Sequence, residues 1–295
     1  YKFLISIYSR EVALLSILFI LTSFLTISEI HQAKTDGMLF LFITLCNLLV
    51  FKAIFDGHLS NHFKLLYWVS MAMGILVKGP IILIFTILPL LAMSIIQKRN
   101  FFNFIWTKYG FFIFFLISVP WFVLISIKSN GLFWHESVIN DLFNKVRSGQ
   151  ESHGFVPGYY TLLIFLFFWP GSIFIPSFFI NLKIKFKEYF IKNNLNCFLI
   201  LYFLLPFVLY EVIPTKLPHY VFPSYAALSI LISKEIISSN FKSSLLKYAF
   251  LPTVIFPLTI MSVIAFAIYK YSSFDTFFFL IILTFLSFLF LLIFF

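Results

Sequence analysis

Residues 108–127 read KYGFFIFFLISVPWFVLISI, an apolar run long enough to cross about 30 Å of hydrocarbon as one helix. Similar runs recur along a chain of 295 residues that is 61% hydrophobic and only 11% charged. A soluble domain cannot bury so much apolar surface, so the sequence predicts that lipid surrounds the protein. Because lipid offers the backbone no hydrogen-bond partners, the predicted fold is all-α, a polytopic membrane helical bundle.

Length and hydrophobicity predict nine to ten spans in a single transmembrane domain that covers residues 1–295. The segment 66–97 is interrupted at Lys78-Gly79-Pro80, where proline removes a backbone donor, and is predicted to form a helical hairpin with short arms. The other predicted spans are 12–30, 37–55, 108–127, 158–182, 196–213, 220–237, 248–269 and 276–295.

The net charge of +10 reflects where lysine and arginine lie between the spans, and it does not indicate a nucleic-acid partner. The most basic connections are expected in the cytoplasm; they are 56–65, 98–108, 183–195 and 234–247. The opposite connections are expected to face outward, namely 31–36, 128–157, 214–219 and 270–275. This orientation places Lys78 at the outer tip of the hairpin.

The outward connection 128–157 carries apolar residues at helical spacing from Leu132 to Val146, which is typical of a helix in the membrane interface. Such a helix would deliver Arg147 and His153 to the bilayer surface. Arginine binds phosphate through two parallel hydrogen bonds, and histidine donates a hydrogen bond or relays a proton. The alternative is a solvated connector.

Two further outward clusters have both a structural and a functional interpretation. Lys34-Thr35-Asp36 begins a span, so Thr35 or Asp36 is expected to cap the helix, while Asp36 beside Glu29 and His31 is also suited to orient a nucleophile or hold a metal. The segment 214–220 presents Lys216, His219 and Tyr220 between prolines, and it serves either as a rigid turn or as a binding surface.

Lys78 lies where the helix break frees backbone amides, which predicts an anion site, although a snorkelling lysine is the alternative. Together, Lys34, Lys78, Arg147 and Lys216 gather cations on one face of the membrane. Cations at the head-group level of so apolar a chain predict a phosphate that is attached to a lipid.

The ordered motifs resemble those of a known superfamily. They are Lys34-Thr35-Asp36, Leu76-Val77-Lys78-Gly79-Pro80, Val119-Pro120-Trp121-Phe122, Gln150-Glu151-Ser152-His153-Gly154, Pro157-Gly158-Tyr159-Tyr160, Phe168-Trp169-Pro170-Gly171 and Thr215-Lys216-Leu217-Pro218-His219-Tyr220. This set resembles bacterial members of the protein-mannosyltransferase and lipid A aminoarabinose-transferase superfamily, which are C-type glycosyltransferases that use polyprenyl-phosphate sugars.

The resemblance implies transfer of a sugar from an undecaprenyl-phosphate donor to a lipid A-like or protein acceptor, at the periplasmic face of the bacterial inner membrane. It implies that Asp36 is a supporting acid of the site. The implied substrate-binding residues are Lys34, Lys78, Arg147, His153, Lys216, His219 and Tyr220. No cofactor is required by the sequence, a divalent metal is compatible with it, and the identity of the sugar is left open.

One feature departs from the superfamily pattern. Its first outward loop, with an Asp-Glu pair, normally precedes the motifs above, and this chain begins at Tyr1 without it and ends in an apolar run. We therefore expect a fragment whose main catalytic base lies in that loop. A transporter or flippase of lipid-linked sugars and an inactive truncated relic are the alternatives. Polar residues gathered at one rim favour the enzyme over a transporter, whose polar residues lie near the midplane.

Overall fold

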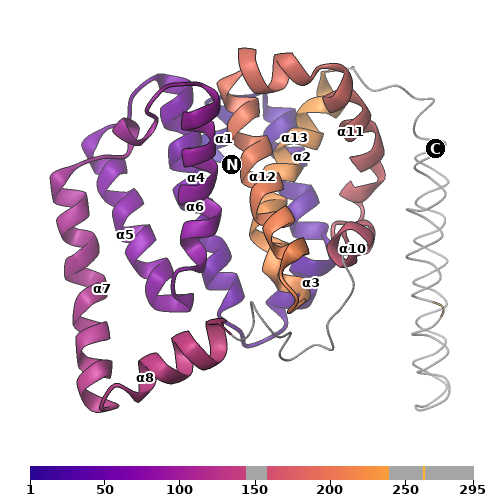
Figure 1. Ribbon diagram of the computed structural model, residues 1–295. Coiled ribbons are helices and arrows are strands. Elements are labelled where there is room, and N and C mark those ends of the chain that lie inside the picture. Colours follow the sequence, from indigo (N-terminus) through magenta and orange to yellow (C-terminus); the bar gives the residue numbers. More distant parts are fainter. Residues whose placement is uncertain (144–157, 239–261, 263–295) are drawn as a thin grey trace.

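The computed structural model describes residues 1–143, residues 158–238 and residue 262. The described part is a bundle of helices that pack side by side, and short segments connect them at both ends of the bundle (Figure 1). Within residues 1–143 and 158–238, four helical segments are long and apolar enough to cross a membrane, namely Asp36–Asp56, Lys108–Lys128, Asn194–Val212 and Pro218–Ile237. The predicted class, a polytopic helical membrane protein, is confirmed; the predicted number of spans is not.

The first predicted span, 12–30, is two helices rather than one. Helix α2 (Arg10–Thr22) follows the short α1 (Lys2–Ile5), and α3 (Phe24–Ile30) continues at an angle of 59°. Ser23 stands at the bend in an extended conformation, and its hydroxyl accepts a hydrogen bond from the Thr26 amide. A serine that caps the second helix therefore ends the first one.

The predicted break at Lys78-Gly79-Pro80 is confirmed. Helix α5 (Asn61–Lys78) ends there, Gly79 takes a φ of +66°, and α6 (Ile81–Ile96) returns along the bundle (Figure 1). The arms have 18 and 16 residues, and the first begins five residues before the predicted start of the segment. Gly74 lets the arms approach, because a Cβ there would lie only 2.1 Å from Cδ1 of Ile82.

The predicted single span 158–182 was also wrong. Helix α10 (Tyr159–Phe167) is followed by the 3₁₀ turn η3 (Gly171–Phe174) and by α11 (Ile175–Ile184). Pro170 has no amide hydrogen and cannot continue the ladder of hydrogen bonds, so the helix stops before it. The predicted spans 248–269 and 276–295 lie outside the described residues.

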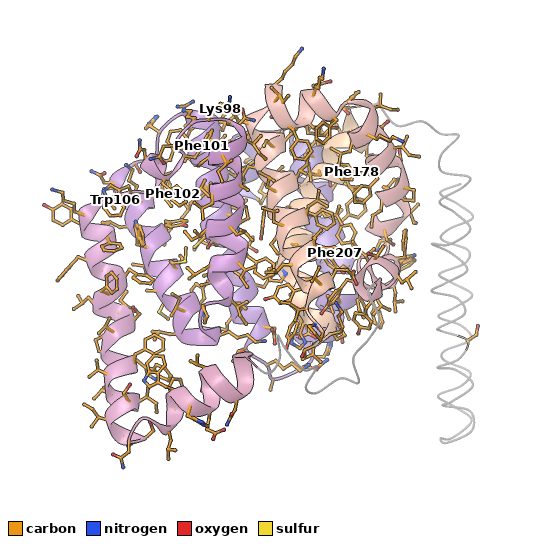
Figure 2. All side chains as sticks on the ribbon, in the orientation of Figure 1. Lys98, Phe101, Phe102, Trp106, Phe178 and Phe207 are labelled. Carbon is orange, nitrogen blue, oxygen red and sulfur yellow. The ribbon has the colours of Figure 1, made fainter. Side chains whose placement is uncertain are left out.

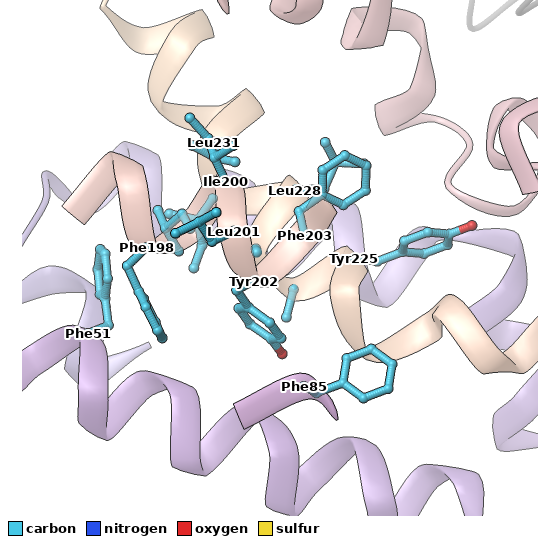
Figure 3. Packing of buried hydrophobic residues seen from close by; sticks show 14 of the residues in the cluster. Phe51, Phe85, Phe198, Ile200, Leu201, Tyr202, Phe203, Tyr225, Leu228 and Leu231 are labelled. Atoms are coloured by element: carbon cyan, nitrogen blue, oxygen red, sulfur yellow. The ribbon is translucent and has the colours of Figure 1, made fainter. Parts of the chain in front are cut away.

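Helix α12 (Asn194–Val212) lies at the centre of the bundle. It packs against α6, α4 (Asp36–Asp56) and α13 (Tyr225–Ile237), which begins directly after the 3₁₀ segment η5 (Pro218–Ser224). Figure 3 shows Phe198 and Tyr202 of α12 between Phe51 of α4 and Phe85 of α6. These large buried side chains fix how the elements that carry the polar residues sit against one another.

Helix α7 (Lys108–Lys128) stands at the outside of the bundle against α5 (Figure 1). Trp68 of α5 contacts the rings of Phe111 and Phe114 at centroid distances of 5.5 and 5.8 Å. Most other side chains of α7 are exposed, as expected of a helix that faces lipid.

After α7 the chain turns sharply and runs across the end of the bundle. The segment consists of α8 (Leu132–Trp134) and a π-helical stretch η2 (His135–Phe143), and Figure 1 shows it nearly perpendicular to α7. The Trp134 indole donates a 2.6 Å hydrogen bond to the Ser126 hydroxyl, which holds the segment against the end of α7. A helix is therefore present where one was predicted; its location in a membrane interface stays a prediction.

The remaining short elements lie at the opposite end. They are η1 (Phe102–Phe104), between α6 and α7, and η4 (Glu188–Lys192), between α11 and α12. Figure 2 places Lys98 and Phe101 at this end, away from α8. The bundle therefore separates a face that carries Lys98 and Arg99 from a face that carries α8 and the break after Lys78.

Candidate functional site

A cluster of charged side chains lies where α3, α4, α5 and η5 meet. Its centre is an ion pair in which Nζ of Lys78 lies 2.5 Å from Oδ1 of Asp36. Lys78 is the last residue of α5 and Asp36 is the first of α4, so two helix ends meet there. Asp36 is only 7% exposed, which means that the packing, and not only the charge, holds its carboxylate in place.

His219 joins this pair to a second carboxylate. Its Nε2 lies 3.8 Å from Oδ2 of Asp36, and its Nδ1 lies 4.0 Å from Oε1 of Glu29. Glu29 is the penultimate residue of α3 and is 7% exposed. The bend between α2 and α3 is what turns this carboxylate toward His219, so the unexpected helix break contributes to the site.

An aromatic side chain and a second lysine also belong to this cluster. The Tyr220 ring lies 5.9 Å from Nζ of Lys78 and 5.1 Å from the His219 ring. Nζ of Lys34 lies 4.0 Å from Oε1 of Glu29, and the Lys34 side chain is 42% exposed. The cluster therefore offers two ammonium groups, two carboxylates and an imidazole at one end of an otherwise apolar bundle.

The ammonium of Lys216 contacts the end of α12. It donates to the carbonyl oxygens of Tyr210, at 2.8 Å, and of Glu211, both at the end of α12. Its burial lowers the pKa of the Lys216 ammonium, and the nearby Glu211 carboxylate opposes that shift. Lys216 caps the unpaired carbonyls of a helix C-terminus. Its predicted role in substrate binding stays a prediction.

Glu211 forms a second polar junction that was not predicted. Its carboxylate accepts hydrogen bonds from the Gly158 amide at 2.7 Å, from the Thr161 amide at 3.0 Å and from the Thr161 hydroxyl at 3.1 Å. The carboxylate thus caps the first turn of α10 from a different helix. An acidic residue at the end of an apolar span is costly, and that cost was the signal in the sequence.

Tyr160 ties the same junction to η5. Its hydroxyl donates to the carbonyl of Leu217 at 3.0 Å and accepts from the Leu217 amide at 3.1 Å. Because Leu217 immediately precedes η5, this contact links the start of α10 to the segment that carries His219 and Tyr220.

The structure brings Lys34, Asp36, Lys78, His219 and Tyr220 together as predicted neighbours. Thr35 stands before α4 but makes no side-chain capping bond, so the capping interpretation is not supported for it. Nδ1 of His31 lies 2.7 Å from the Ile27 carbonyl of its own helix. Arg147 and His153 lie outside the described residues.

The fold and the cluster together define a class, that of polytopic helical membrane proteins with a buried charged site at one end of the bundle. Residues 3–135 match the sequence model of the family described as dolichyl-phosphate-mannose-protein mannosyltransferase. The resemblance that the ordered motifs predicted is therefore confirmed over part of the chain.

Two curated relatives are similar to this chain. Over 182 residues it is 25% identical to undecaprenyl phosphate-alpha-4-amino-4-deoxy-L-arabinose arabinosyl transferase 1 of Pseudomonas fluorescens, a match that covers 59% of this chain and 31% of the relative. Over 230 residues it is 24% identical to undecaprenyl phosphate-alpha-4-amino-4-deoxy-L-arabinose arabinosyl transferase 2 of Proteus mirabilis. This match covers 77% of this chain and 40% of the relative. The chain spans less than half the length of these relatives.

The fold is similar to that of ArnT from Cupriavidus metallidurans. The crystal structure of ArnT bound to undecaprenyl phosphate matches with a TM-score of 0.65 and 18% identity, over 87% of this chain and 45% of ArnT. The apo structure matches with a TM-score of 0.51 and 17% identity, over 87% of this chain and 48% of ArnT. At this identity the likeness concerns the fold.

Proposed function

We propose that this protein is an integral-membrane glycosyltransferase that transfers a sugar from an undecaprenyl-phosphate-linked donor to a lipid A-like or protein acceptor. The observation that carries the proposal is the Lys78–Asp36–His219 cluster, buried at one end of a lipid-exposed bundle. The names of the two relatives and the ligand of one ArnT structure support it, because they combine a polyprenyl phosphate with pentose transfer.

Lys78 is the residue best placed to meet the donor phosphate. Its side chain is 26% exposed, so the ammonium is held by Asp36 and still reaches the surface of the site. A phosphate gains negative charge as the sugar leaves it, and a fixed cation stabilises that charge without further reorganisation. Tyr220 flanks the ammonium with its ring and supplies a hydroxyl at the same rim.

Asp36 acts as a supporting acid in this proposal. One carboxylate oxygen faces Lys78 and the other faces His219, so Asp36 fixes the position of both groups. Lys34, with its exposed ammonium, is placed to meet an anionic part of the donor or acceptor. Arg147 and His153 keep their predicted substrate-binding roles, and the site is proposed to face the periplasm from the bacterial inner membrane.

The test is a reconstituted transfer reaction. Protein in liposomes receives undecaprenyl-phosphate 4-amino-4-deoxy-L-arabinose and lipid A, and mass spectrometry measures the modified lipid A. The full-length wild-type protein should form product, and Asp36→Asn in it should reduce the rate by about 100-fold or more, because the anchor of both Lys78 and His219 loses its charge. Asp56→Asn is the matched control at the other end of α4 and should keep the rate.

The transporter alternative predicts a different result in the same liposomes. A flippase would move the donor across the bilayer without acceptor and would form no modified lipid A. Donor movement without transfer would therefore overturn the proposal, and so would equal rates for the two asparagine variants.

A further inference from the structure

A groove with one charged end lies where α6 ends and the chain turns toward η1, at the end of the bundle away from the candidate site. Its volume is about 400 Å³. Leu91, Ile95 and Phe102 line it with apolar surface, and Lys98 and Arg99 line it with positive charge. We propose that this groove binds one anionic glycerophospholipid, with the lipid phosphate at the two cations and an acyl chain along α6. The proposal does not depend on the transferase reaction.

Exposed aromatic residues mark the level of the lipid head groups at this end of the bundle. Trp106 precedes α7 and Tyr109 lies in its first turn, and both side chains are exposed. Tryptophan and tyrosine gather where lipid tails meet head groups, because their rings are apolar and their N–H and O–H groups need polar partners. Figure 2 shows Lys98, Phe102 and Trp106 at the same end of the bundle. Lys98 therefore lies near the level of the lipid phosphates, while Ile95, one turn earlier on α6 and 75% exposed, faces the acyl chains.

A closed turn carries Lys98 and Arg99. The Arg99 amide donates to the carbonyl of Ser94 at 3.1 Å, and the Ser94 hydroxyl accepts from the Phe101 amide at 3.3 Å. Within this turn Lys98 takes a φ of +50°, a conformation that residues other than glycine rarely adopt. These hydrogen bonds fix the backbone that carries the two cations, and such preorganisation reduces the cost of binding a ligand.

The guanidinium of Arg99 is held against two aromatic rings. Its central carbon lies 5.5 Å from the ring centroids of both Phe101 and Phe104. Cation–π contacts hold the planar group, and its N–H edge suits two parallel hydrogen bonds to a phosphate. Within residues 1–143 and 158–238, neither Arg99 nor Lys98 forms an ion pair with a carboxylate. The charge of both groups is therefore available to an external anion.

The neighbouring segment 183–192 extends the positive surface. The side-chain amide of Gln97, at the end of α6, donates to the carbonyl of Phe190 in η4, which places the two elements side by side. The segment has one acid, Glu188, and four lysines, which are Lys183, Lys185, Lys187 and Lys192. Its exposed apolar residues are Ile184, Phe186 and Ile191. Lysines interleaved with exposed apolar residues are typical of a surface that binds anionic lipids, so the surroundings of the groove favour an anionic lipid over a zwitterionic one.

The groove is separate from the position proposed for the sugar donor. Lys78 lies before the start of α6 and Lys98 lies after its end, and a helix of 16 residues is about 24 Å long. One phosphate therefore cannot contact both cations. The apolar wall also distinguishes a lipid from a free anion, because an acyl chain packs against Leu91 and Ile95, whereas inorganic phosphate makes no use of them.

The experiment measures lipid binding to the full-length protein, purified in detergent and washed free of bound lipid. Native mass spectrometry counts bound dioleoyl-phosphatidylglycerol and dioleoyl-phosphatidylcholine, which share their acyl chains and differ in net charge. The wild type should bind one phosphatidylglycerol about tenfold or more tightly than phosphatidylcholine. The double variant Lys98→Gln/Arg99→Gln should lose about tenfold or more in phosphatidylglycerol affinity. The matched control, Lys2→Gln/Arg10→Gln, removes the same charge from exposed residues outside the groove and should bind as the wild type does.

Two further measurements test the apolar wall. Ile95→Gln, on the exposed side of α6, should weaken phosphatidylglycerol binding although both cations remain. Inorganic phosphate in excess should not displace the lipid from the wild type. Equal affinities of the Lys98→Gln/Arg99→Gln variant and its control would overturn the proposal, as would displacement by inorganic phosphate. Loss of sugar transfer with lipid binding intact would count against the proposed function and leave the lipid site standing.

Discussion

Nζ of Lys78 lies 2.5 Å from Oδ1 of Asp36, and this ion pair joins the last residue of one helix to the first residue of another. The two residues are 42 positions apart in the sequence. Helix α4 ends with a comparable pair, Lys52 and Asp56, at 2.8 Å within one helix. The carboxylate of Asp36 is more buried than that of Asp56, so the two ion pairs should contribute differently to the stability of the fold.

Lys78→Met should therefore destabilise the protein more than Lys52→Met. Without Lys78, the carboxylate of Asp36 stays buried without its main partner, which should cost about 2 kcal/mol or more. The pair of Lys52 with Asp56 is an i,i+4 pair whose two side chains are 22% and 29% exposed, so its loss should cost below about 1 kcal/mol. Thermal unfolding in detergent measures both, and similar melting temperatures would contradict this ranking.

Glu211→Gln should loosen the start of α10. The carboxylate caps the amides of Gly158 and Thr161, and its neutral amide replacement accepts hydrogen bonds less strongly. We expect a loss of about 1–2 kcal/mol in the free energy of unfolding. Hydrogen exchange at the two amides should accelerate as well. Glu188→Gln, an exposed acid in η4, is the control and should leave both quantities unchanged.

Lys216 should make stability depend on pH. Burial lowers its pKa in the folded protein, so the unfolded chain binds more protons between the lowered value and the ordinary pKa of about 10.4. Stability should consequently rise with pH across that interval and should be constant with respect to this group below it. Melting temperatures of wild type and Lys216→Met, compared up to about pH 10.4, measure the effect. A parallel pH profile in the variant would contradict it.

The hairpin of α5 and α6 predicts which positions share a side of the membrane. His62→Cys lies in the first turn of α5 and Asn100→Cys lies just after α6, both at the end of the hairpin away from Lys78, so both should react with a maleimide from the same side. Lys128→Cys, at the end of α7, should react from the other side (Figure 1). The native Cys46 and Cys197 are buried and should stay unlabelled. Reaction of positions 62 and 100 from opposite sides would refute the hairpin.

Several features of the fold were accessible because they are local. The apolar runs at 37–55, 108–127 and 196–213 correspond closely to α4, α7 and α12, since each run has the length and composition of a span. The break at Gly79-Pro80 was equally predictable, because proline removes a backbone donor directly after a glycine that can take the φ of +66° found there, whereas Pro89, Pro120 and Pro206 stand inside helices. The break before Pro170 followed the same rule, but only the short stretch Pro-Gly-Ser at 170–172 interrupts the apolar run there, and the segment was predicted as one span.

The site also combines features that are local in the sequence with features that depend on the tertiary structure. Lys34, Asp36, Lys78, His219 and Tyr220 were recognisable as polar residues that are costly in an apolar chain, and their placement at the ends of spans predicted one face. The grouping of Glu29 with His219 was not recognisable, because it depends on the 59° bend between α2 and α3. The contacts of the Lys216 ammonium with the carbonyls of Tyr210 and Glu211 were not recognisable either, since they depend on how the end of α12 packs against Lys216.

The sequence by itself determined that the chain is helical and membrane-embedded, because hydrophobic length and backbone hydrogen bonding leave lipid-exposed segments little choice. It also indicated which polar residues gather at one end of the bundle. Only the tertiary structure decided that Lys78 pairs with Asp36 and that Lys216 caps a helix. Those partners lie on different elements, and contacts between elements depend on how large side chains pack, which no local pattern in the sequence encodes.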